Sequence, residues 1–198
     1  MRKRWRRLPL WFMVLMIVPL PAFGGAPLET MQTQVNKVLG VLSDPALKGE
    51  SAKAVKEKKI WSVADSIFDY TELSKRTLAQ QWQAFTPEQQ KEFTSLFGKL
   101  LGNLYLGKMM SYANERVVFK KETQTSEDTA EVQSEIVTQT KTIPIHYRMI
   151  LKQDEWKVYD VVIEGVSLVM NYRSQFREIL ANKSPEDLLK MLREKVRG

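Results

Sequence analysis

The chain has 198 residues, with 30 Lys and Arg against 23 Asp and Glu, one His and no Cys. A chain without cysteine has no disulfide framework and no thiol chemistry. Its formal charge of +7 would favour a nucleic-acid partner, but the first seven residues hold five of the basic side chains. The remainder carries 25 basic against 23 acidic residues, which argues against nucleic-acid binding.

The N-terminus is typical of a secretory signal peptide. Five positive charges within residues 2–7 precede an apolar stretch over residues 8–20, and small residues follow at 22–24. The apolar stretch is shorter than the about 20 residues that a membrane span needs. We therefore expect residues 1–24 to be a signal peptide and residues 25–198 to form one exported domain.

Apolar residues at helical spacing predict a helical part over about residues 25–112. Its last helix has the clearest start, because Thr86 can act as N-cap, Pro87 occupies the first helical position and Gln89 can reach back to the cap. The four predicted helices begin and end near 28–44, 50–68, 69–82 and 86–112.

Two glycines, Gly98 and Gly102, interrupt the last of these helices. Each costs about 1 kcal/mol relative to alanine in a helix. Two explanations remain open: another helix approaches closely at these positions, or the missing side chains leave volume for a ligand.

The hydrophobic period changes to two over about residues 116–164, which predicts a sheet. Short polar links separate the strands, as in an antiparallel meander. The four predicted strands cover 116–122, 129–139, 142–151 and 156–164. In the third, Ile145, Tyr147 and Met149 alternate as an inner face, which places His146 on the opposite, exposed face. A single histidine cannot build a histidine cluster for a metal.

After Gly165 the period changes back to that of a helix, and Ser184 caps a last helix. These C-terminal helices cover about residues 166–197. The predicted architecture is α+β, with a curved four-stranded antiparallel sheet packed on helices.

Asp160 is the one charged residue on a predicted strand face that it shares with Trp156, Val158 and Val162. Burying a carboxylate without a partner costs several kcal/mol of free energy, roughly, so Asp160 must pair with a cation or lie at the sheet rim. A structural ion pair with Arg148 or Arg173 would satisfy it. Burial could instead raise its pKa, as in a roll-fold enzyme that uses an acid as a base.

The segments V-Y-D-V-V-I-E-G-V-S-L-V (Val158 to Val169) and N-Y-R-S-Q-F (Asn171 to Phe176) resemble the signature of MlaC-type proteins, the toluene-tolerance family of periplasmic phospholipid carriers. The likeness covers roughly residues 60–180 and includes three further motifs: Phe68–Tyr70, Thr86–Gln89 and Ile143–Arg148. The resemblance implies a cone-shaped sheet like the nuclear-transport-factor roll, with a small helical part. It also implies a periplasmic location.

The partners that the resemblance implies are a phospholipid, an outer-membrane lipid-extracting complex and an inner-membrane ABC-transporter complex with a lipid-binding ring. The carrier would shuttle lipid between these complexes and so maintain outer-membrane lipid asymmetry. The basic C-terminal helix is a candidate docking surface.

We expect the lipid chamber between the inner face of the sheet and the long helix. The expected wall consists of Phe97, Leu101, Leu104, Tyr105, Ile136, Ile145, Tyr147, Met149, Val158, Val162, Val166, Val169 and Met170. Three arginines are candidates to meet the lipid phosphate: Arg148, Arg173 and Arg177.

Two other functions remain open. One is a periplasmic escort for lipoproteins or other hydrophobic cargo, and the other is the roll-fold enzyme with Asp160 as base. The sequence contains no G-x-S-x-G, phosphate-binding loop or H-E-x-x-H. It therefore favours a carrier without catalytic residues, metal or cofactor.

Overall fold

The computed structural model describes residues 26–111 and 115–197, so the predicted signal peptide lies outside the described residues. The helices of this part are α1 (Ala26–Ser43), α2 (Lys53–Ile67), α3 (Tyr70–Leu78), α4 (Pro87–Met110), α5 (Leu168–Leu180) and α6 (Pro185–Arg197), with short 3₁₀ turns at Pro45–Leu47, Glu50–Ala52 and Ala79–Ala84. The strands are β1 (Arg116–Gln124), β2 (Thr129–Val137), β3 (Thr142–Lys152), β4 (Glu155–Ile163) and β5 (Val166–Ser167). Within these residues, no helix has the length and apolar content that crossing a membrane requires.

The strongest predicted helix start is confirmed at α4. The Thr86 hydroxyl accepts a hydrogen bond from the Gln89 backbone N at 3.3 Å, and Gln89 Oε1 accepts one from the Thr86 backbone N at 3.1 Å. This capping box satisfies two backbone donors that the first helical turn leaves free.

The strands form one antiparallel sheet in the order β1-β2-β3-β4-β5. Four strands were predicted, and the fifth corrects that expectation, because Val166 and Ser167 pair with β4 instead of opening a helix. The Ser167 hydroxyl accepts a hydrogen bond from the Met170 backbone N at 3.1 Å and is the N-cap of α5. The helix therefore begins at Leu168.

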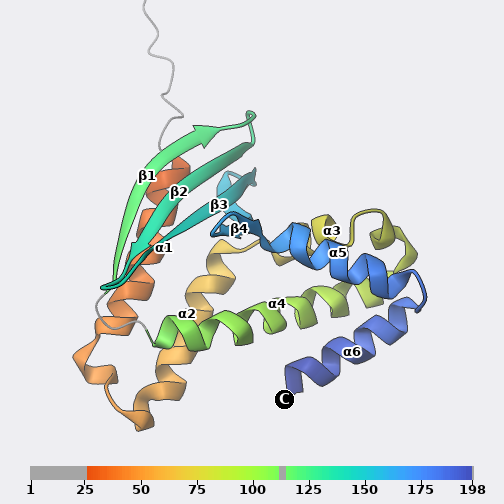
Figure 1. Cartoon of the computed structure of the whole chain (residues 1–198), viewed down its shortest axis with the longest axis horizontal. Helices are drawn as coiled ribbons and strands as arrows, with labels where there is room; N and C mark the ends of the chain where they lie inside the picture. Colours follow the sequence, from red (N-terminus) through yellow and green to blue (C-terminus); the bar gives the residue numbers. More distant parts are fainter. Residues whose placement is uncertain (1–25, 112–114, 198) are drawn as a thin grey trace, which may run out of the picture.

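One face of the sheet, called the inner face below, packs against α1. Cross-strand pairing puts Val132, Tyr147 and Val161 in one row on this face. Glu122 belongs to the same row, and its carboxylate accepts a hydrogen bond at 2.9 Å from the backbone N of Leu28, near the start of α1. Figure 1 shows α1 passing behind β1 and β2 and continuing beyond the end at which β1 begins.

A register shift in β4 corrects the predicted face of Asp160. Arg148 pairs with Asp160, whereas its neighbour Met149 pairs with Val158, so a bulge separates these two pairs. Asp160 and Val158 therefore lie on opposite faces, and Val162 lies with Asp160 on the outer face. The prediction of one shared face was wrong because a bulge breaks the two-residue alternation of a strand.

Helices α3 to α6 form a second layer beside the sheet (Figure 1). Four rings from α4 and α5 make its centre, with neighbouring ring centroids between 5.1 and 5.5 Å apart: Phe93, Phe97, Tyr172 and Phe176. Most of these pairs meet edge to face, which is a favourable arrangement for aromatic rings. The Arg193 guanidinium of α6 holds the Glu92 carboxylate of α4 through two contacts of 2.7 and 2.9 Å.

Gly98 and Gly102 of α4 are explained by close approach of neighbouring aromatic side chains. A Cβ at Gly98 would lie 3.1 Å from the ring of Tyr70, and one at Gly102 would lie 1.8 Å from the ring of Trp61. The rings of α2 and α3 thus occupy the volume that the missing side chains leave. The alternative, that this volume serves a ligand, is wrong.

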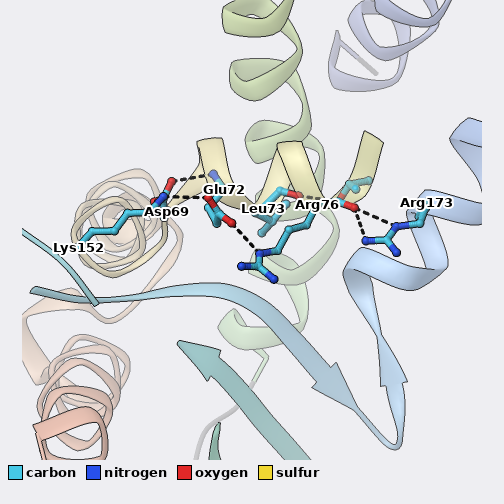
Figure 2. A network of polar contacts seen from close by, with 7 residues as sticks. Asp69, Glu72, Leu73, Arg76, Lys152 and Arg173 are labelled. Carbon is cyan, nitrogen blue, oxygen red and sulfur yellow. Dashed lines mark hydrogen bonds and ion pairs between the residues drawn. The ribbon is translucent and has the colours of Figure 1, made fainter. Parts of the chain in front are cut away.

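Polar contacts fix α3 at both of its ends (Figure 2). At its start, Lys152 Nζ of β3 lies 2.7 Å from Asp69 Oδ2 and 3.0 Å from Glu72 Oε2. At its end, the Arg173 guanidinium of α5 donates two hydrogen bonds to the carbonyl of Arg76. A cation at the C-terminus of a helix satisfies a free carbonyl and complements the helix dipole.

Candidate functional site

The inner face of the sheet changes from fully buried to half-exposed along its length. At one end Ala130, Met149 and Val158 face each other across three strands and are at most 2% exposed. Further along, Val132 is fully buried and Tyr147 is partly exposed. Helices therefore cover one end of this apolar face completely and the other end incompletely.

The half-exposed end consists mainly of apolar residues, with the buried Ser134 of β2 among them. Phe119, Ile145 and Ile163 are partly buried, and Val166 on the edge strand is 55% exposed. Pairing places Ile145, Ile163 and Val166 in one row across β3, β4 and β5. The next row contains Val117 at the beginning of β1 and Ile136 at the end of β2, which are partly exposed, and the buried Ile143 at the start of β3. This incompletely covered apolar surface, which we call the open end of the inner face, is the candidate binding surface.

The C-terminal half of α4 supplies further apolar surface. Leu101 is buried, Leu104 is 49% exposed and Tyr105 is partly buried. Burial raises the pKa of Tyr105, and burial together with the nearby Tyr105 hydroxyl raises the pKa of Tyr172 on α5. Burial likewise raises the pKa of Tyr147, although its hydrogen bond with Ser134 opposes this. These phenols therefore stay neutral at physiological pH and add no charge to the apolar surface.

The predicted wall residues fall into three groups. Those on the inner face are Ile136, Ile145, Tyr147, Met149 and Val158, and those on the C-terminal half of α4 are Leu101, Leu104 and Tyr105. Phe97 of α4 was also predicted to line the chamber, but it lies in the aromatic centre of the helical layer, against Tyr172 and Phe176. Those that the structure does not bring to the inner face are Val162, which is on the outer face, Val169, which is buried at the start of α5, and the half-exposed Met170. Val166 extends the inner face at its edge.

Sequence reasoning missed Phe119, Val161 and Ile163 as inner-face residues. A register shift between Phe119 and Lys121 places Phe119 on the same face as Glu122, which simple alternation in β1 does not predict. The bulge in β4 has the same effect on Val161. Strand period alone cannot reveal such positions.

Asp160 is a buried anchor for the start of α5. Its carboxylate is 2% exposed and accepts hydrogen bonds from Arg148 Nη1 at 3.1 Å, Ser167 Oγ at 2.6 Å and the Val169 backbone N at 3.1 Å. Both oxygens are thus occupied by donors of the protein. This geometry is that of a structural ion pair, in which the carboxylate holds Arg148 and the start of α5.

The candidate phosphate-binding arginines are placed on the outer side of the sheet and beyond it. Arg148 contacts Asp160 and also Glu131 at 3.5 Å, while Arg173 holds the end of α3. Arg177 is exposed on α5. His146 also lies on the outer face, with its Nδ1 3.5 Å from Glu131. Among residues 26–111 and 115–197, no group of three or more His, Asp and Glu side chains is arranged to hold a metal.

Two hollows open elsewhere on the surface. One of about 700 Å³ lies between the junction of α2 and α3 and the β3–β4 hairpin, where Phe68 and Tyr70 stack with ring centroids 5.8 Å apart. The other, of about 390 Å³, lies between α1 and α2. Neither of these two hollows is lined by a residue of the predicted wall.

Comparison with known proteins gives consistent matches. A family model described as MlaC protein matches residues 32–194. The intermembrane phospholipid transport system binding protein MlaC of Haemophilus influenzae is 23% identical over 124 residues, which cover 60% of this chain and 58% of that protein. The solved structure of a phospholipid-binding protein from Ralstonia solanacearum, in complex with a phospholipid, matches with a TM-score of 0.77 and 24% identity. That match covers 87% of this chain and 98% of the other. The structural match shows that the two proteins share a fold.

Proposed function

The chain belongs to the MlaC family, and we propose that it is a periplasmic phospholipid-binding protein which carries lipid between the outer and the inner membrane. The two proteins that resemble it are both named for phospholipid binding or transport. The observation that carries the proposal is the open end of the inner face, where Phe119, Ile145 and Ile163 are only partly covered. In this proposal residues 1–24 are removed on export and residues 25–198 are the carrier domain.

The free energy of burying hydrocarbon explains why such a surface can hold a lipid. Burial of one methylene is worth about 0.8 kcal/mol. Two acyl chains with about 30 methylenes would therefore gain about 24 kcal/mol before the costs of binding are deducted. Even a fraction of this value makes release into water slow.

Binding requires the cover over the inner face to move. The buried end is packed at Met149 and Val158, both 0% exposed, so the acyl chains would enter at the open end and displace the helices there. The anchored start of α5 and the fixed ends of α3 leave α1, which packs on β1 and β2, as the element that can separate from the sheet.

Handover follows from the same energetics. Because release into water is slow, lipid should leave only where a partner offers an equally apolar site. We propose that these partners are an outer-membrane lipid-extracting complex and an inner-membrane ABC-transporter complex with a lipid-binding ring. In this proposal the carrier itself performs no reaction, and Asp160 has a structural role at the start of α5.

The test is the identity and amount of lipid that purifies with the exported protein. Organic extraction and mass spectrometry should recover glycerophospholipid from the wild type and much less from Ile145→Trp, whose ring fills the open end. Thr142→Trp is the matched control, because Thr142 is exposed on the outer side of the same strand. It should retain wild-type lipid.

Two results would contradict this proposal. An empty wild-type protein that also fails to take up lipid from detergent would refute phospholipid carriage. Recovery of an acylated protein instead of phospholipid would favour an escort for lipoproteins.

A further inference from the structure

One end of the hairpin formed by α1 and α2, residues 37–59, carries a local excess of positive charge. Residues 37–59 hold six lysines against three acidic residues, a net charge of +3, whereas residues 26–198 together carry only +2. Residues 26–36 and 60–198 together therefore carry a net charge of −1. The lysines are Lys37, Lys48, Lys53, Lys56, Lys58 and Lys59, and all but Lys56 are exposed.

Most of these ammonium groups lack an anionic partner. Lys53 pairs with Glu50 at 3.2 Å, and Lys37 contacts only the amide oxygen of Gln34 at 3.4 Å. Lys58 and Lys59 have no carboxylate within ion-pair distance in the described part of the chain. Unpaired ammonium groups on one surface are available to a polyanionic partner.

The same surface offers apolar contacts between the lysines. Val55, on the outer side of α2, is 49% exposed. The hollow of about 390 Å³ between the two helices is lined by Val41 and Val63, with Lys37, Lys59 and one carboxylate, Asp44, beside them. Gly40 has no atom within 4 Å of the position of a Cβ, so this hollow is open. Lysines around small apolar residues are typical of surfaces that lie on a bilayer, because the long side chains reach the head groups while the apolar atoms meet the interface.

The hairpin is also placed where a lipid carrier would need such a surface. In Figure 1, α1 leaves the sheet at the end where β1 begins, and its hairpin with α2 projects beyond that end. The half-covered residues Val117 and Ile136 lie at the same end of the inner face. A bilayer that contacts the hairpin would thus lie next to the open end of the inner face.

From these observations we propose that the α1–α2 hairpin is a docking surface for anionic lipid bilayers. Lys37, Lys58 and Lys59 contact the head-group phosphates, and Val55 contacts the interface. The inference rests on the proposed carrier function, because docking matters only if the open end then exchanges lipid with the bilayer. Each lysine near an anionic surface contributes about a fivefold gain in affinity.

Co-sedimentation with lipid vesicles tests the docking surface. The exported, processed protein should bind vesicles of equal parts phosphatidylcholine and phosphatidylglycerol and should not bind vesicles of phosphatidylcholine alone. About 1 M NaCl should abolish the binding, because it shortens the Debye length to about 3 Å. The variant Lys37→Gln/Lys58→Gln/Lys59→Gln should bind about 100-fold more weakly, from about fivefold for each lysine.

The matched control removes the same charge from the other basic helix. Lys190, Lys195 and Arg197 are exposed on α6, and Lys190→Gln/Lys195→Gln/Arg197→Gln should retain most of the binding. Equal losses of vesicle affinity in both triple variants would mean that net charge alone determines binding, and would overturn the proposal. A wild-type protein that does not bind the anionic vesicles would also overturn it. That result is expected if the hairpin binds an acidic protein instead of a bilayer.

Lipid content measured on the same preparations separates this inference from the carrier function. A wild-type protein that holds phospholipid but does not bind anionic vesicles refutes docking alone. A protein that never holds phospholipid refutes carriage, and with it the purpose of docking, whatever the vesicles show. Unchanged circular dichroism of both triple variants establishes that each is folded.

Discussion

Replacing Asp160 with alanine should destabilise the protein more than any exposed charge removal. The change deletes the acceptor of three hydrogen bonds, from Arg148, Ser167 and the backbone N of Val169. Hydrogen bonds to a charged group are worth about 1.5–3 kcal/mol each. The Arg148 side chain is 39% exposed, so water can replace part of its contact.

The donors at the start of α5 have no such replacement. Val169 is 4% exposed, and an unpaired buried donor costs about 1–3 kcal/mol. The hydrogen bonds from Ser167 and the Val169 backbone N, at about 1.5–3 kcal/mol each, therefore account for most of the loss. We therefore expect Asp160→Ala to lower the free energy of unfolding by about 3–5 kcal/mol, and the Tm by about 10 °C for a domain of this size.

Urea unfolding followed by circular dichroism measures this loss, with Glu178→Ala as the control. Glu178 is exposed on α5, the helix whose start Asp160 holds, and its removal should change the free energy of unfolding by less than about 0.5 kcal/mol. A loss below about 1 kcal/mol for Asp160→Ala would refute the role of this carboxylate as an anchor. Asp160→Asn keeps an acceptor but loses the charge, so its loss should lie between the two.

Two further predictions concern packing and pH. Gly102→Ala should destabilise the protein by about 1–3 kcal/mol because the new methyl group meets the Trp61 ring. Gly107→Ala should stabilise it by up to about 1 kcal/mol, because a Cβ at this position meets no atom within 4 Å. Urea unfolding measures both free energies, and equal effects of the two variants would contradict the packing argument. Burial opposes ionisation of Asp69, but its hydrogen bond with Lys152 and the other contacts outweigh it and hold its pKa below the usual value. The stability from this pair is therefore present above about pH 4 and is lost as the pH falls through the lowered pKa. Lys152→Gln should be less stable than the wild type at pH 7, and its free energy of unfolding in urea should depend less on pH in the acid range. An unchanged acid dependence would contradict this assignment.

Local signals predicted most of the helices and strands. The capping box at Thr86 and the cap at Asp69, whose carboxylate accepts a hydrogen bond from the Glu72 backbone N at 2.8 Å, depend only on residues a few positions apart. The alternation of apolar and polar residues in β3 likewise predicts one strand and the side chains on each of its two faces. Such features could be predicted because the residues that specify them are neighbours in the sequence.

Contacts between distant residues could not be predicted in this way. Trp61 fills the space at Gly102, and a glycine in a helix does not tell which residue approaches it. The bulge beside Asp160 moved Val158 to the other face, although the strand itself was correctly placed. A one-residue shift inverts the faces of every following residue, so a small local irregularity changes the candidate site more than the fold.

The binding surface depends on coverage, which strand periodicity does not encode. Ile145 and Met149 occupy equivalent inward positions of β3, yet Met149 is 0% exposed and Ile145 is partly exposed. The difference arises because the helices cover one end of the inner face fully and leave the end near the start of β1 less covered. A sequence can thus identify the apolar face that a lipid would contact, but the position at which the lipid enters is determined by where the covering helices diverge from the sheet.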